Sequence, residues 1–102
     1  AKGLASMLEC LDMSDMGALL RATQLLVREA QRRGLARGQR TCLGCRFFRP
    51  YVGGRDDKPH FCAYVRQPFG DADLRIDCAE HEPAEPALVE AAAACFGRRI
   101  PP

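Results

Sequence analysis

Apolar residues near the N-terminus recur with the spacing of an α-helix. Asp12 and Ser14 interrupt this pattern, and either side chain can cap a helix that begins after it. The sequence therefore predicts a short helix followed by a new helix start. The apolar face of the short helix contains four residues, at positions i, i+3, i+4 and i+7: Leu4, Met7, Leu8 and Leu11.

A second, longer helix is predicted from about Asp15 to Arg33, with Gly34 suited to end it. A helix of this size is about 30 Å long, so the rest of a small chain cannot cover all of its apolar stripe. We therefore expect the stripe to pair with a second copy of the chain, giving a homodimer. The expected buried face has seven members: Met16, Leu19, Leu20, Thr23, Leu26, Val27 and Ala30.

Glycines and prolines punctuate the middle of the chain, which favours turns and short extended pieces over helix. Residues 35–41 read as a linker, and Gly53-Gly54 with the charged residues after it reads as an exposed loop tip. Residues 60–66 and 74–76 have the composition of β-strands.

A last helix is predicted from about Ala87 to Phe96, after two prolines and before Gly97. The whole pattern predicts a mostly helical α+β protein in three parts. These are a helical dimerisation arm (1–40), a cysteine-rich, metal-binding module (41–83) and a C-terminal helix and tail (84–102).

Composition narrows the class of protein only slightly. With 47% apolar and 27% charged residues the chain is typical of a globular domain, and no apolar run is long enough to span a membrane. The first residues lack the pattern of a signal peptide, so we expect a cytoplasmic protein with reduced thiols. Four arginines crowd the end of the arm, where a solvated helix end is a better explanation than a nucleic-acid contact: Arg32, Arg33, Arg37 and Arg40.

Four of the six cysteines form the most informative motif, with the spacing C-x2-C-x16-C-x15-C. Thiolates are strong ligands for zinc and for iron–sulfur clusters, and a close pair followed by two single cysteines suits one shared metal centre. Free buried thiols and disulfides are the alternatives. The expected ligands of a metal or cluster are Cys42, Cys45, Cys62 and Cys78.

The residues leave the identity of the metal open. A [4Fe–4S] cluster uses all four cysteines, whereas zinc is more often held by two tight pairs, the second of which would be Cys78 with His81. His60 is an alternative ligand, or a partner that hydrogen-bonds within the shell around the metal. Five aromatic residues in the module suit either a cluster kept from water or an ordinary small core: Phe47, Phe48, Phe61, Tyr64 and Phe69.

Other candidate sites are weaker. We expect Cys10 and Cys95 to be small buried residues. The aspartates at 71, 73 and 77 lack the spacing of a calcium loop and are expected to serve as turn and surface residues. Because the chain has no catalytic motif with its supporting context, we expect that it is not an enzyme.

Residues 42–48, CLGCRFF, with single cysteines at 62 and 78, resemble the C-x2-C-x-F-F motif of high-potential iron–sulfur proteins. The same residues, with CAEHEP at 78–83, are similar to small cluster-bearing subunits of some glycyl-radical enzymes. These resemblances imply a [4Fe–4S] cluster with four cysteine ligands.

Residues 41–83, with PHFCA at 59–63, PFGD at 68–71 and LRIDC at 74–78, resemble a cysteine-rich C-terminal extension of some MarR-family transcription regulators. Lys2-Gly3-Leu4 resembles the start of that family's long dimerisation helix. The resemblance implies the C-terminal part of a longer regulator, which contacts DNA only through a domain absent from this chain.

The residues alone predict a metal-bound dimeric module. The resemblance to MarR-family regulators implies more, namely a metal- or [4Fe–4S]-binding module for sensing and dimerisation in a MarR-like transcription regulator. The alternatives are a small electron-transfer or accessory subunit and a structural zinc-binding module.

Overall fold

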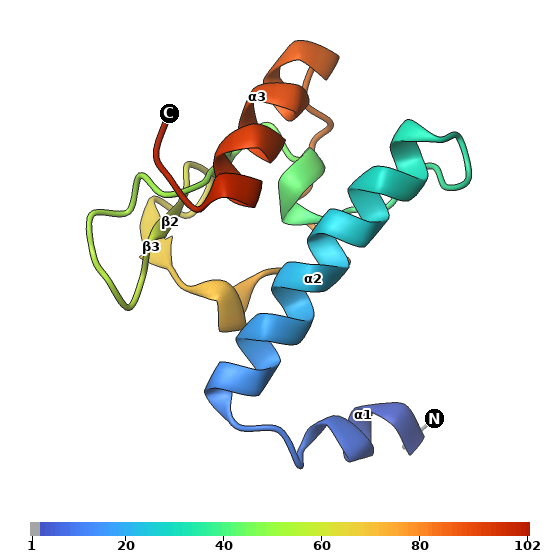
Figure 1. The fold of residues 1–102 in the computed structure, drawn as a ribbon, viewed down its shortest axis with the longest axis vertical. Helices are drawn as coiled ribbons and strands as arrows, with labels where there is room; N and C mark the ends of the chain where they lie inside the picture. The colour runs from blue at the N-terminus through green and yellow to red at the C-terminus, as the bar shows by residue number, and fades with distance from the viewer. Residues whose placement is uncertain (1–2) are drawn as a thin grey trace.

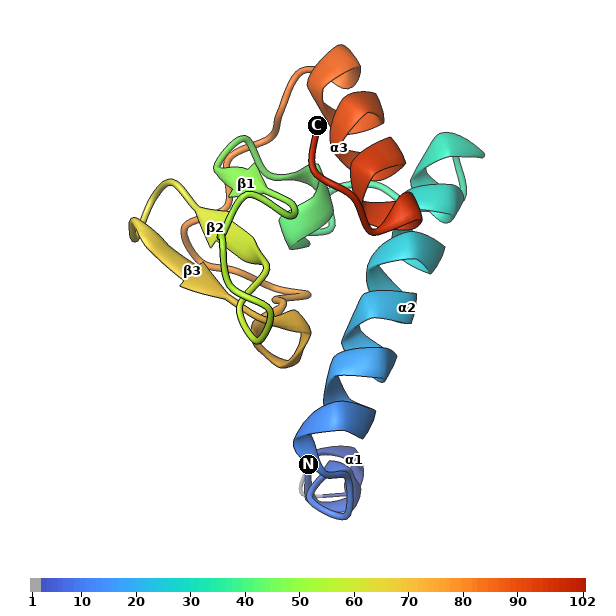
Figure 2. The same ribbon diagram turned by 60° about the vertical axis from the view of Figure 1, so that its left-hand side comes forward.

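The computed structural model describes residues 3–102. Helices and a small antiparallel sheet combine into an α+β fold, which confirms the predicted fold class. The sheet and the last helix lie on the same side of the long helix, and the first helix extends from its far end (Figure 1; Figure 2). The elements, in chain order, are α1 (Gly3–Leu8), α2 (Met13–Arg32), the 3-10 helix η1 (Cys42–Gly44), β1 (Phe48–Arg49), β2 (His60–Cys62), β3 (Gln67–Phe69), the 3-10 helix η2 (Asp71–Asp73) and α3 (Pro86–Arg98).

Helix α2 has defined signals at both ends. The Asp12 carboxylate accepts a hydrogen bond of 2.8 Å from the N–H of Asp15, so the helix begins at Met13, slightly before the predicted start. At the other end Gly34 has φ of 74°, and the N–H of the next residue bonds back to the carbonyl of Ala30 over 2.8 Å. This is the glycine-terminated helix end that the sequence predicts.

The face of α2 that the chain covers is not the predicted one. Its buried residues are Gly17, Arg21 and Gln24, whereas Leu26 is 71% exposed and Leu19 is 43% exposed. The other five predicted residues are only partly buried. The difference arises because the buried polar side chains form hydrogen bonds with loops and with the end of α3. Of the predicted face, Leu19 and Leu26 remain exposed, while Leu20 packs against the edge of the core.

Arg21 joins α2 to the C-terminal end of α3. Its guanidinium donates to the carbonyl of Phe96 over 2.6 Å and to the hydroxyl of Tyr51 over 2.9 Å, and it stacks on the Phe96 ring. Phe96 is fully buried and belongs to the central core, together with Leu43, Phe48 and Leu74. A cation near the carbonyl end of a helix is electrostatically favourable, which compensates for its burial.

The sheet has the order β1-β2-β3, with Phe48 opposite Cys62 and His60 opposite Phe69. The predicted strand over 60–66 ends at Cys62 because residues 63–66 form a turn, in which Arg66 has φ of 59°. Residues 74–76 are not a strand; a single parallel bridge pairs Asp77 with Arg40 instead.

Helix α3 continues through Gly97 and ends where Arg99 adopts φ of 59°, so the predicted end at Phe96 is slightly too early. Cys95 is buried as expected, but Cys10 lies exposed after the end of α1. Among residues 3–102, no helix combines the length and the apolar character needed to cross a membrane.

Candidate metal centre

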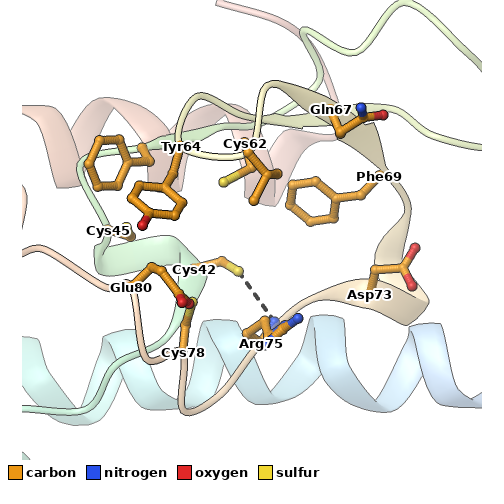
Figure 3. Close-up of a pocket in the computed structure, with 12 residues that line it drawn as sticks. Cys42, Cys45, Cys62, Tyr64, Gln67, Phe69, Asp73, Arg75, Cys78 and Glu80 are labelled. Carbon is orange, nitrogen blue, oxygen red and sulfur yellow. Dashed lines mark hydrogen bonds between the residues drawn. The ribbon is translucent and has the colours of Figure 1, made fainter.

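The four predicted ligands line a single cavity of about 190 Å³. Figure 3 shows Cys62 on the side of the β2–β3 hairpin, with Cys42 and Cys78 across the space from it and Cys45 at one end. The sequence places these residues up to 36 positions apart, and the fold brings them to the walls of one pocket.

The first two cysteines are held by a single turn of 3-10 helix. The N–H of Cys45 bonds to the carbonyl of Cys42 over 2.9 Å, and the N–H of Phe48 bonds to the carbonyl of Cys45 over 3.2 Å. Between them Leu43 inserts its side chain into the core, where it is 1% exposed. The turn is therefore anchored by packing, with the cysteines of both ends left at the cavity wall.

Two extended segments bring Cys78 beside Cys42. The N–H of Cys42 bonds to the carbonyl of Arg75 over 3.1 Å, and the N–H of Cys78 bonds to the carbonyl of Arg40 over 3.0 Å. Cys62 reaches the cavity from the opposite side because it is the last residue of β2, paired with Gln67 across the hairpin.

Cys42 lies in the most strongly perturbed environment of the four. Burial raises the pKa of its thiol to about 11, and the neighbouring sulfurs of Cys78, Cys45 and Cys62 raise the pKa further because like charges repel. The backbone N–H of Arg75 opposes this effect by donating a hydrogen bond of 3.2 Å to the sulfur. A cationic metal centre at this place would supply the charge that the thiolates need.

The remaining walls are mostly apolar. Phe47, Tyr64, Val65 and Phe69 line the cavity, and the rings of Phe47 and Tyr64 lie 5.3 Å apart between centroids. Polar side chains stand at the edge of the site; among them, the exposed Glu80 accepts a contact of 3.6 Å from the thiol of Cys78. An apolar shell of this kind limits the access of water to a bound cofactor.

Thiolate sulfur is a ligand of both zinc and iron–sulfur clusters, so the four cysteines in the lining fit either group. Among the described residues, no group of three His, Cys, Asp or Glu side chains is arranged to hold a metal ion.

The two histidines lie outside this cavity. His60 is fully buried; its Nδ1 accepts from the N–H of Tyr51 over 3.2 Å and its Nε2 contacts Asp71 Oδ1 over 2.7 Å. Both ring nitrogens are therefore engaged, and neither is free to bind a metal. Burial lowers the pKa of His60, and the hydrogen bond to Asp71 opposes that shift.

His81 is not among the residues that line this cavity, and the Cys78–His81 zinc pair stays a prediction. Its Nε2 is buried near Gly44 and has no hydrogen-bond partner among the residues described. Burial lowers the pKa of His81, with a smaller opposing effect from the Gly44 backbone.

The charged residues noted in the sequence have structural roles. Asp71 contacts His60, and Asp77 pairs with Arg40 over 2.6 Å. At the end of α2 the exposed Arg32 and Arg33 both pair with Glu29, and their hydrogen bonds lower the pKa of that carboxyl to about 2. This arrangement agrees with a solvated helix end.

Sequence patterns miss one residue that the structure places beside the site. Gln24 of α2 is 0% exposed; its Oε1 accepts from the N–H of Leu43 over 2.9 Å, and its Nε2 donates to the carbonyl of Arg75 over 2.7 Å. A glutamine in an amphipathic helix usually faces solvent, so only its position one helical repeat after Gly17 hints at burial.

No family model, curated protein or solved structure matches the chain.

Proposed function

We propose that the chain binds a [4Fe–4S] cluster through Cys42, Cys45, Cys62 and Cys78 and acts as a sensing and dimerisation module. The observation that supports this proposal is that four cysteines line one mostly apolar cavity. The thiols supply the ligands, the Arg75 N–H supplies a donor to sulfur, and the aromatic walls limit water.

Four cysteine ligands leave the cluster no open coordination site, so the proposed role is redox or cluster sensing rather than catalysis. The cluster would join the hairpin that carries Cys62 to the opposite segments that carry Cys42 and Cys78. Because metal binding and folding are coupled in small modules, loss of the cluster would loosen the contact between these parts.

The contacts of α2 favour sensing over simple electron transfer. η1 and the Arg75 segment both hydrogen-bond to Gln24 in the middle of α2, so the proposed cluster lies next to the helix that exposes Leu19 and Leu26. We propose that α1 and α2 pair two chains in a cytoplasmic MarR-like regulator. DNA would be contacted by a domain attached to this module.

A small electron-transfer subunit is the second candidate. Tyr64 and Val65 line the cavity and are 53% and 57% exposed, so a redox partner that docks there would approach the cluster closely. A structural zinc module held by the same four cysteines is the third candidate.

The decisive experiment is metal analysis of protein purified without oxygen. We expect a brown protein with broad visible absorption and about four iron and four sulfide per chain. Each of Cys42→Ser, Cys45→Ser, Cys62→Ser and Cys78→Ser should lower the iron content and stability of the cluster. Cys10→Ser is the matched control, because Cys10 is exposed and outside the cavity. A colourless protein with one zinc per chain would refute the cluster.

The regulatory part of the proposal needs a separate test. In a regulator that contains this module, Cys62→Ser should change the affinity for promoter DNA in an electrophoretic mobility shift assay. Equal affinity for promoter DNA with and without the cluster would mean that the module has only a structural role.

A further inference from the structure

Gln24 is a fully buried polar side chain in the middle of α2, and its amide connects to two separate segments of the metal centre. The side-chain oxygen of Gln24 accepts a hydrogen bond from the N–H of Leu43, and its amide nitrogen donates one to the carbonyl of Arg75. The bond to Leu43, of 2.9 Å, is buried, and the bond to Arg75, of 2.7 Å, is partly buried. A buried hydrogen bond is costly to break because the freed backbone group cannot find solvent.

One of these segments contains Cys42 itself, and the other donates a hydrogen bond to its sulfur. Leu43 follows Cys42 in the turn that carries the first two ligands. Arg75 donates its N–H to Cys42 Sγ over 3.2 Å and accepts the N–H of Cys42 over 3.1 Å. Gln24 therefore completes a ring of hydrogen bonds that fixes the donor to this sulfur and the turn that presents it.

We propose that Gln24 is a positioning residue that sets the N–H···S bond at Cys42 and couples the state of the metal centre to α2. The inference rests on the proposed cluster and names how that site is regulated. A donor to a ligand sulfur favours the more negatively charged, reduced form of a cluster, so it raises the reduction potential. Because coupling between two sites is reciprocal, a change at the sulfur also changes the stability of α2 around Gln24.

A purely structural role for Gln24 makes different predictions. Buried amides are normally hydrogen-bonded, and a structural glutamine would affect only the free energy of unfolding. A positioning residue also changes the reduction potential of the loaded protein and the protection of amides when the cluster is added or removed.

The test compares Gln24→Met with Gln31→Met. Methionine matches the length of glutamine and removes both hydrogen bonds. Gln31 lies two turns further along α2, where its side chain contacts Gln39 over 3.3 Å and does not line the cavity, so it is the matched control.

In the loaded protein we expect Gln24→Met to lower the reduction potential in a mediated titration with a chemical reductant. The variant should also lose its cluster in air roughly 10-fold faster than wild type, as is typical when a group supporting a metal ligand is removed. Gln31→Met should match wild type in both measurements. A reduction potential of Gln24→Met equal to that of wild type overturns the inference and leaves the cluster proposal intact.

A second measurement needs no variant and covers the case in which Gln24→Met does not fold. Hydrogen exchange of wild type should show slower exchange of the Leu43 and Arg75 amides, and of α2 around Gln24, with the cluster than without it. Equal exchange of α2 in the two states overturns the coupling. If wild type takes up no cluster at all, the proposed function fails, and the inference fails with it.

Discussion

Tyr64 and Phe47 pack together at the wall of the cysteine cavity, with 5.3 Å between their ring centroids. Tyr64 comes from the turn after β2 and Phe47 from the residues before β1, so the pair closes the cavity between two neighbouring segments. Removing the Tyr64 ring should admit water and oxygen to a bound cluster.

We therefore predict that Tyr64→Ala loses its cluster in air about five-fold faster than wild type, since an aromatic pair contributes about 1 kcal/mol. The measurement is the decay of visible absorption after exposure to air. Tyr64→Phe, which keeps the ring, should decay at the wild-type rate. Equal decay rates of wild type and Tyr64→Ala would show that this ring does not shield the site.

The pKa of Cys42 predicts a pH dependence of cluster assembly. At neutral pH this thiol is protonated in the metal-free protein, because burial raises its pKa to about 11. Ligation requires the thiolate, so binding releases a proton, and uptake should strengthen as pH rises from neutral toward that value. Proton release on reconstitution can be measured in weakly buffered solution. A pH-independent uptake would contradict this assignment of the ligand.

The metal-free protein offers an independent check of the same pKa. Because the thiolate is the reactive form, Cys42 should react slowly with iodoacetamide at mild pH. The exposed Cys10 should react faster, and peptide mass spectrometry separates the two.

The sequence identifies the four cysteines because their residue type and spacing carry chemistry whatever the surrounding fold. It also locates α2, since Asp12 and Gly34 act through local geometry that neighbours do not alter. The fold class follows from these local patterns for the same reason.

The covered face of α2 is not predictable in this way. Leu26 and Arg21 both lie on the helix, and which of them is buried depends on the loops and helix end that meet it. Arg21 is covered because it satisfies carbonyls at the end of α3, which lie 75 residues away in sequence. Likewise, the turn that shortens β2 contains Arg66 at positive φ. A glycine at this position would have indicated the turn in the sequence, but an arginine does not.

The two exposed leucines of the predicted face of α2, Leu19 and Leu26, predict self-association through this helix. Leu26 is 71% exposed on this helix, so Leu26→Glu should place a charge in the proposed dimer contact. We expect wild type to sediment as a dimer and Leu26→Glu to shift to monomer at the same concentration. Leu35→Glu is the matched control, because Leu35 is 78% exposed but lies beyond the helix. A wild type that stays monomeric at high concentration would exclude this contact.

Because His60 is buried, we predict that the free energy of unfolding falls in mild acid. Burial lowers its pKa below the ordinary value of 6.5, and the contact with Asp71 offsets only part of the shift. The unfolded chain therefore binds a proton before the folded chain does, and the free energy of unfolding falls as pH drops below about 6.5. Urea unfolding at a series of pH values measures the slope. In His60→Gln, which cannot titrate, the part of the slope due to His60 should disappear.

The loop before β2 has no room for a side chain at Gly53. A Cβ at this position would lie 2.6 Å from the carbonyl oxygen of His60 and closer still to that of Lys58. The backbone cannot yield easily, because the N–H of Gly53 bonds to the carbonyl of Pro59 over 2.7 Å. Residues 54–58 are exposed, as expected of a loop tip, but Gly53 is packed against the start of the strand that carries Cys62.

We expect Gly53→Ala to lower the free energy of unfolding by about 2 kcal/mol, as overpacking does elsewhere. Gly97→Ala should raise it by up to about 1 kcal/mol, because Gly97 lies within α3 and its Cβ would meet no atom within 4 Å. Chemical denaturation compares the two variants. Since the displaced segment leads directly into β2, Gly53→Ala should also retain less iron than Gly97→Ala, and equal retention would mean that the loop does not support the ligand.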